Sequence, residues 1–81
     1  MRDKARIPEI LDLIQEIWNK DQDMRFFQLI FNLQANFSKE NKNIGKVEQI
    51  EPDGFTKVGF NLFNIEDKVL TDFLVEYLKK D

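Results

Sequence analysis

Residues 24–37 read MRFFQLIFNLQANF, a stretch with more large apolar side chains than one helix on a protein surface requires. At about 100° per residue, one set shares a helical face that we expect to pack against other helices: Phe26, Leu29, Ile30, Leu33 and Phe37. Phe27 and Phe31 project beyond Gln34 and widen the apolar arc to about 200°, where little more than about 100° is needed. We call these two residues the phenylalanine wing. Because large exposed apolar patches are avoided, we expect the wing to be covered.

Three helices are predicted from the spacing of apolar residues, over about residues 7–20, 23–37 and 65–79. The apolar face of the first consists of Ile7, Ile10, Leu11, Ile14, Ile17 and Trp18. That of the last consists of Val69, Leu70, Phe73, Leu74, Tyr77 and Leu78.

Capping residues indicate where these helices begin. The first helix is expected to start after Asp3 or at Pro8, whose fixed φ suits an early helical position. Asp23 is placed as the N-cap of the second helix. Asn64 stands three residues before Asp67, an arrangement like a capping box at the start of the third.

A β-hairpin is expected between the second and third helices, over about residues 44–63. The polar run SKENKN at residues 38–43 indicates a loop, and the sequence Glu51-Pro52-Asp53-Gly54 has the composition of a tight turn between KVEQI and FTKVGFNLF. Gly59 weakens the second strand, so an irregular extended excursion is the alternative. The predicted fold is therefore a mainly α, three-helix domain with a hairpin or extended excursion.

The composition favours one small domain, over residues 1–81, that depends on packing for its stability. The 81 residues include eight Phe and no Cys or His, which suits a reducing compartment and excludes disulfides and thiolate metal sites. The start of the chain lacks a secretory signal, and no segment reaches the length of a membrane span, so we expect a cytoplasmic protein without a membrane contact. The net charge of −3 arises from interspersed signs.

Catalytic chemistry is not expected from this set of residues. Without His or Cys, the lone Ser38 has no partner for nucleophilic catalysis. The carboxylate pairs Asp21 with Asp23 and Glu66 with Asp67 are explained by helix starts rather than by a metal ion. We therefore predict no catalytic, cofactor or metal site, and no small-molecule substrate is evident.

The candidate contact residues for a partner lie at the start of the second helix: Phe27, Phe31, Met24, Arg25 and Gln28. If a second subunit covers the wing, a weak homodimer is expected, and an unidentified protein is the other possible partner. The intramolecular alternative is cover by the hairpin, through Phe55, Val58, Phe60 and Leu62.

Two side chains have both a structural and a binding interpretation. Trp18 is expected to pack in the core with its indole N–H bonded to a carbonyl at the helix end, although Trp is also common in binding hot spots. Arg25 either braces the turn, pairing with an acid such as Asp21, or recognises a partner together with Gln28.

Several stretches resemble a known family: MRDKARIPEILDLIQEIW, DMRFFQLIFNL and LFNIEDKVLTDFL are similar to the small uncharacterised bacterial and phage-encoded proteins related to the YihD type. The resemblance covers roughly residues 1–37 and 60–81, where residues in matching order are Trp18, Asp23, Arg25, Gln28 and the run Ile65-Glu66-Asp67. Gln22 replaces a Pro usual in that family, and the segment 39–59 is longer. The resemblance implies a small helical fold in a bacterial or prophage setting, and no activity.

These observations predict a small non-catalytic protein, a protein-interaction or assembly module of bacterial or prophage origin. The alternatives are a weak nucleic-acid-binding or regulatory protein, and an accessory subunit of an enzyme. Nucleic-acid binding is not favoured, because the exposed side of the second helix offers only one basic residue, Arg25.

Overall fold

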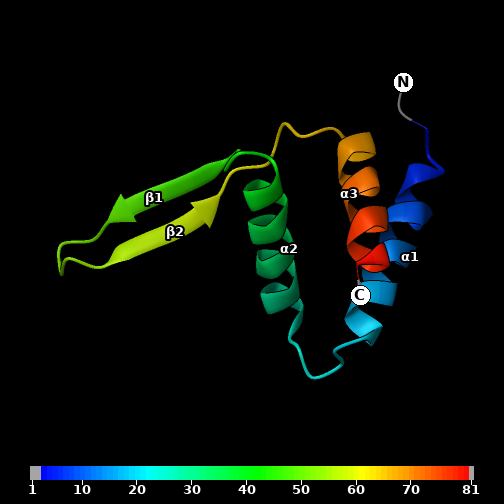
Figure 1. Cartoon of the computed structure of the whole chain (residues 1–81), viewed down its shortest axis with the longest axis horizontal. Coiled ribbons are helices and arrows are strands. Elements are labelled where there is room, and N and C mark those ends of the chain that lie inside the picture. Colours follow the sequence, from blue (N-terminus) through cyan, green and yellow to red (C-terminus); the bar gives the residue numbers. More distant parts are fainter. Residues whose placement is uncertain (1–2, 81) are drawn as a thin grey trace. The chain divides into compact units, whose positions relative to one another are not determined.

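The computed structural model describes residues 3–80 and confirms a small, mainly helical fold with a two-stranded antiparallel hairpin between the second and third helices (Figure 1). In chain order the elements are α1 (Arg6–Asn19), α2 (Phe26–Glu40), β1 (Lys46–Ile50), β2 (Thr56–Phe60) and α3 (Asp67–Lys79). They form two compact units, which we call the helical unit (Met1–Arg25 with Ile65–Asp81) and the hairpin unit (Phe26–Asn64).

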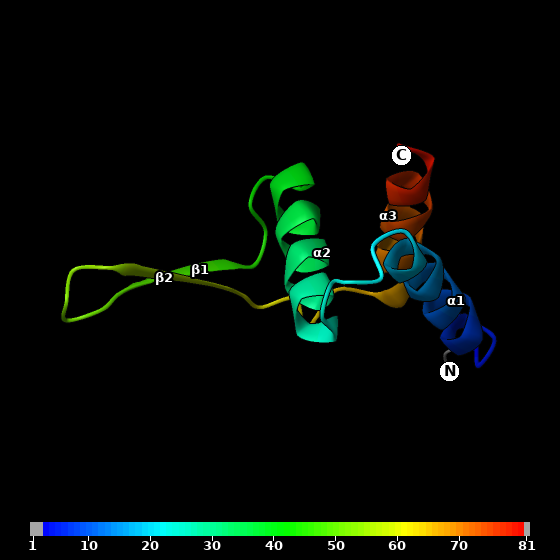
Figure 2. The same ribbon diagram turned by 90° about the horizontal axis from the view of Figure 1, so that it is seen from below.

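The helical unit consists of α1 and α3, which lie side by side (Figures 1 and 2). Its buried apolar side chains are Ile17, Phe73 and Leu74, and Leu74 is completely inaccessible. Phe73 also contacts the ring of Tyr77 at a centroid separation of 5.8 Å. Two members of the predicted apolar face of α1, Ile7 and Leu11, are exposed. The buried face of α1 is therefore narrower than the apolar periodicity predicted.

Of the two expected helix starts in this unit, the one after Asp3 is confirmed, whereas the one at Asn64 is wrong. The backbone N–H of Ala5 is bonded to the Asp3 carboxylate at 3.0 Å, and α1 begins at Arg6, so Pro8 occupies the third helical position, where no intrahelical donor is required. The residue before α3 is Glu66, with no side-chain cap, rather than Asn64. The Glu66 carbonyl instead accepts the N–H groups of Val69 and Leu70.

The helix α2 begins at Phe26, three residues later than predicted, so Asp23 lies outside it. This later start is related to the carbonyl of Met24. If the helix included Met24, that carbonyl would accept the backbone N–H of Gln28, four residues further along. Here it accepts the indole N–H of Trp18 at 2.7 Å, and the Met24 amide is bonded to the Asp21 carbonyl. The segment before Phe26 therefore forms a turn.

The end of α2 is later than predicted as well, at Glu40 rather than at residue 37. Ser38, expected in a loop, is helical and 1% exposed, and its hydroxyl donates to the Ile44 carbonyl at 2.7 Å. The side-chain amide of Asn41 donates to the Phe37 carbonyl. In both bonds a polar side chain of the run SKENKN, which the sequence places in a solvent-exposed loop, is bonded to a backbone carbonyl instead.

The hairpin turn has the chemistry expected of residues 51–54. The Gly54 amide donates to the Glu51 carbonyl at 2.9 Å, and Gly54 has a positive φ of 89°, which glycine adopts without steric cost. The Asp53 carboxylate accepts the Phe55 amide at 3.0 Å. Gly54 thus has the left-handed conformation predicted for the end of the turn.

Gly45 forms the junction between α2 and the hairpin. Its φ is 72°, and a Cβ at this position would lie 2.6 Å from both the Asn61 carbonyl oxygen and a methyl group of Leu62. A contact that short is repulsive, and one of its partners is backbone. The base of the hairpin therefore requires glycine at this position.

We expect Gly45→Ala to destabilise the hairpin unit by more than about 1 kcal/mol, because it combines a left-handed φ with a backbone clash. The matched control is Gly59→Ala, since nothing lies within 4 Å of a Cβ there and the φ is not positive. Denaturant unfolding followed by far-ultraviolet circular dichroism measures both. Equal stability of the two variants would contradict this account of the junction.

Candidate functional site

The two faces of the hairpin differ in chemistry. Lys46 pairs with Phe60, Glu48 with Val58, and Ile50 with Thr56, and residues directly opposite each other project from the same face. We call this the Val58 face, because its centre and both ends contain apolar side chains. The opposite face contains Val47, Gln49, Lys57 and Gly59.

The base of the Val58 face contacts α2. The rings of Phe31 and Phe60 meet edge to face with centroids 5.5 Å apart, a geometry that is favourable for two aromatic side chains. From this contact the two strands extend away from α2 as an arm (Figures 1 and 2). The hairpin therefore contacts one residue of the phenylalanine wing, as the intramolecular interpretation required.

The cover over the wing is incomplete. Phe27 is 83% exposed, and its ring lies edge to face with that of its neighbour Phe26, which is itself half exposed. Two further residues are exposed to a similar degree, Ile50 at 77% and Phe63 at 91%. We give the name hairpin-unit surface to five of the exposed apolar side chains of this unit: Phe27, Ile50, Phe55, Val58 and Phe63. Phe26, Phe31, Ile44 and Val47 are exposed as well, by 44% to 51%.

The predicted contact residues belong to different units. Met24 and Arg25 lie in the helical unit, whereas Phe27, Gln28 and Phe31 lie in the hairpin unit. Arg25 and Gln28 are exposed and Met24 is partly buried. Within the hairpin unit, Phe27, Gln28 and Phe31 share α2.

Ile50 and Phe63 were not among the candidates from the sequence. Ile50 could have been found, because two-residue alternation places it on the Val58 face once the register is known. Phe63 follows β2 outside the alternating strand, and no pattern in the sequence marks it as exposed.

Trp18 has the hydrogen bond expected of a structural residue. Its ring is partly buried and its indole donates to Met24, inside the helical unit. The position of this bond at the end of α1 agrees with the prediction that the indole finds a carbonyl there.

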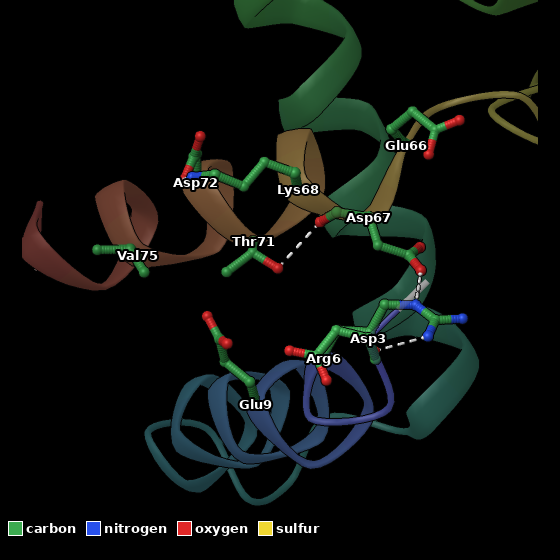
Figure 3. A pocket seen from close by; sticks show the side chains of 9 residues that line it. All are labelled: Asp3, Arg6, Glu9, Glu66, Asp67, Lys68, Thr71, Asp72 and Val75. Atoms are coloured by element: carbon green, nitrogen blue, oxygen red, sulfur yellow. Dashed lines mark hydrogen bonds and ion pairs between the residues drawn. The ribbon is translucent and has the colours of Figure 1, made fainter. Parts of the chain in front are cut away.

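An open hollow of about 440 Å³ lies in the helical unit, near the start of α1 and of α3 (Figure 3). Five acidic and two basic side chains line it: Asp3, Glu9, Glu66, Asp67, Asp72, Arg6 and Lys68. The guanidinium of Arg6 is bonded to the Asp67 carboxylate and to the Asp3 carbonyl. The Thr71 hydroxyl donates to the Asp67 carbonyl at 2.9 Å.

Internal pairing accounts for much of the charge around this hollow. Lys68 contacts Asp72 at 2.8 Å, one helical turn away, and this hydrogen bond and the negative charge of Asp72 raise the pKa of Lys68 above its ordinary value. Exposed pairs of this kind contribute little to stability. In residues 3–80, no group of three or more acidic side chains is arranged to hold a metal ion.

Comparison of the chain with family models, with curated proteins and with solved structures found no match. None of the helices in residues 3–80 has both the length and the apolar character that crossing a bilayer requires. Of the two candidates, the hairpin-unit surface is the stronger, because the acidic and basic side chains around the hollow are engaged with one another in the pairs Arg6–Asp67 and Lys68–Asp72.

A double-mutant cycle on Phe31→Ala and Phe60→Ala should give a coupling free energy of about 0.5–1.5 kcal/mol, because the two rings contact each other directly. Urea unfolding of the four proteins measures it. Phe27→Ala serves as the comparison, since a side chain so exposed should change stability by no more than about 0.5 kcal/mol. A coupling near zero would mean that the ring contact does not hold the hairpin on α2.

Proposed function

We propose that this chain is a non-catalytic, cytoplasmic protein-interaction module, and that the hairpin-unit surface is its contact site. The single observation that supports this most is the exposure of Phe27, Ile50 and Phe63, each more than three-quarters accessible. Single exposed apolar residues are ordinary, but this unit of 39 residues leaves nine large apolar side chains at least 37% exposed, an apolar area that a partner would remove from water.

Association would be favoured by the free energy gained when exposed apolar side chains are buried against a partner. Burying one Phe side chain contributes roughly 2 kcal/mol, so a few such residues offset part of the entropic cost of bringing two molecules together. Aromatic side chains are enriched at the centres of interfaces. A modest affinity is therefore expected.

The absence of His and Cys from the sequence also favours binding over catalysis, because general acid–base and nucleophilic chemistry most often use these residues. The resemblance to bacterial and phage-encoded proteins of the YihD type remains a prediction. If it holds, the module acts in a bacterial or prophage setting.

The test is Phe27→Glu, which places a charge on the surface without removing a buried group. The matched control is Asn32→Glu, also exposed on α2 but about 140° away around the helix. Both variants should stay folded by circular dichroism, and only Phe27→Glu should lose binding in affinity capture from the source cells and in concentration-dependent sedimentation. Retention of every interaction by Phe27→Glu would contradict the assignment of Phe27 to the contact.

A further inference from the structure

The hydrogen-bond pattern between β1 and β2 shows which residues turn their backbone N–H and C=O groups toward the partner strand and which turn them outward. The Asn61 amide donates to the Gly45 carbonyl, and the Glu51 amide to the Phe55 carbonyl. In an antiparallel ladder, bonded pairs alternate with non-bonded ones. The backbone groups of Lys46, Glu48 and Ile50 on β1, and of Thr56, Val58 and Phe60 on β2, therefore point outward from the hairpin.

The two edges differ in how well they are protected against pairing with another strand. Natural edge strands are usually guarded by charged side chains, by proline or by a bulge. On β1 two of the three outward-pointing residues are charged, Lys46 and Glu48. On β2 the corresponding residues are Thr56, Val58 and Phe60, and the pairing runs without interruption along all five residues. β2 is thus the open edge.

The open edge is complementary to itself. When two antiparallel copies of β2 overlap completely, the two-fold axis passes through the middle residue, Val58. Val58 then faces Val58 of the second copy, and Thr56 faces Phe60. A shift by one residue toward the turn would place Lys57 opposite Lys57, which like-charge repulsion disfavours. The same construction on β1 centres on Glu48 and places two carboxylates directly opposite each other.

We propose that a second copy of this chain pairs with β2 along this edge, forming a four-stranded antiparallel sheet in the order β1-β2-β2-β1 with Val58 on the two-fold axis. The inference deepens the proposed function, because it assigns a partner to the hairpin-unit surface and rests on that surface being a contact. It identifies the partner by strand register and charge rather than by apolar area alone.

The hairpin itself would gain from such a partner. Isolated two-stranded hairpins are only marginally stable, and three or more strands with an apolar face are needed for independent stability. Here all five residues of β1 and the first three of β2 are exposed. In the dimer the Val58 faces of both copies join, so that the two Val58 side chains lie side by side on the inner strands, with Phe60 of each copy opposite Thr56 of the other.

A cysteine at the axis tests this arrangement, because the chain has no cysteine of its own. In the proposed register, the Cα atoms of residue 58 in the two copies lie about 5.5 Å apart, within the range that a disulfide spans. Val58→Cys should form a disulfide-linked dimer under mild oxidation about a hundredfold faster than random collision allows at micromolar concentration. The matched control, Ile50→Cys, lies on β1 and leaves the charged residues Lys46 and Glu48 of the guarded edge in place, so it should remain mostly monomeric.

Charge exchange provides a second, independent measurement. In a Glu48→Gln background, which removes the charge that faces residue 58 within the hairpin, Val58→Glu and Val58→Lys should each be monomeric in sedimentation. An equimolar mixture should form a heterodimer, because the register brings residue 58 only against itself. Circular dichroism confirms that each variant is folded before mixing.

The outcomes separate this inference from the proposed function. Equal cross-linking of Val58→Cys and Ile50→Cys, or a mixture that remains monomeric, overturns the β2 register. If the wild-type protein nevertheless dimerises and Phe27→Glu abolishes the dimer, the hairpin-unit surface is still a contact site and only the strand pairing is wrong. A wild-type protein that is monomeric at every concentration overturns the second copy as partner, while capture of another protein that depends on Phe27 would leave the proposed function standing.

Discussion

The hydrogen bond from the Ser38 hydroxyl to the Ile44 carbonyl ties the last turn of α2 to the segment that leads into β1. It buries a polar side chain in the last turn of the helix and satisfies it with a backbone group six residues on. Gly45 follows at once with a positive φ that aligns it with Asn61 across the ladder. The direction of the arm, and with it the accessibility of the Val58 face, follows from this short junction.

The two units differ in their paired charges and in their most exposed apolar side chains. In the helical unit, the charged groups around the hollow largely pair with one another or with the backbone, as Arg6 does with Asp67 and Lys68 with Asp72. In the hairpin unit, the strands leave α2 after a single ring contact and retain apolar residues at their far end. For this reason the hairpin unit supplies the surface on which the proposed function rests.

The sequence was sufficient for the elements whose signals are local. Helical periodicity located three helices, and the Pro52-Asp53-Gly54 chemistry located the turn. Both ends of α2 were misplaced, because each depends on a side chain bonded to a backbone carbonyl six residues away, from Trp18 to Met24 and from Ser38 to Ile44. A carbonyl is present at every residue, so such a contact leaves no mark in the pattern. The wide apolar arc of α2 identified Phe27 and Phe31 from the sequence. The exposure of Ile50 and Phe63 depends on the path of the hairpin, which only the folded chain defines.

The position of Trp18 has a consequence for spectroscopy. The chain contains one Trp and one Tyr, and both belong to the helical unit, whereas the aromatic residues of the hairpin unit are all Phe. Intrinsic fluorescence therefore originates in the helical unit alone, with the indole bonded at the turn that precedes α2. Emission and backbone dichroism consequently sample different sets of residues, and a comparison of their melting curves shows whether the two units unfold as one cooperative body or in succession.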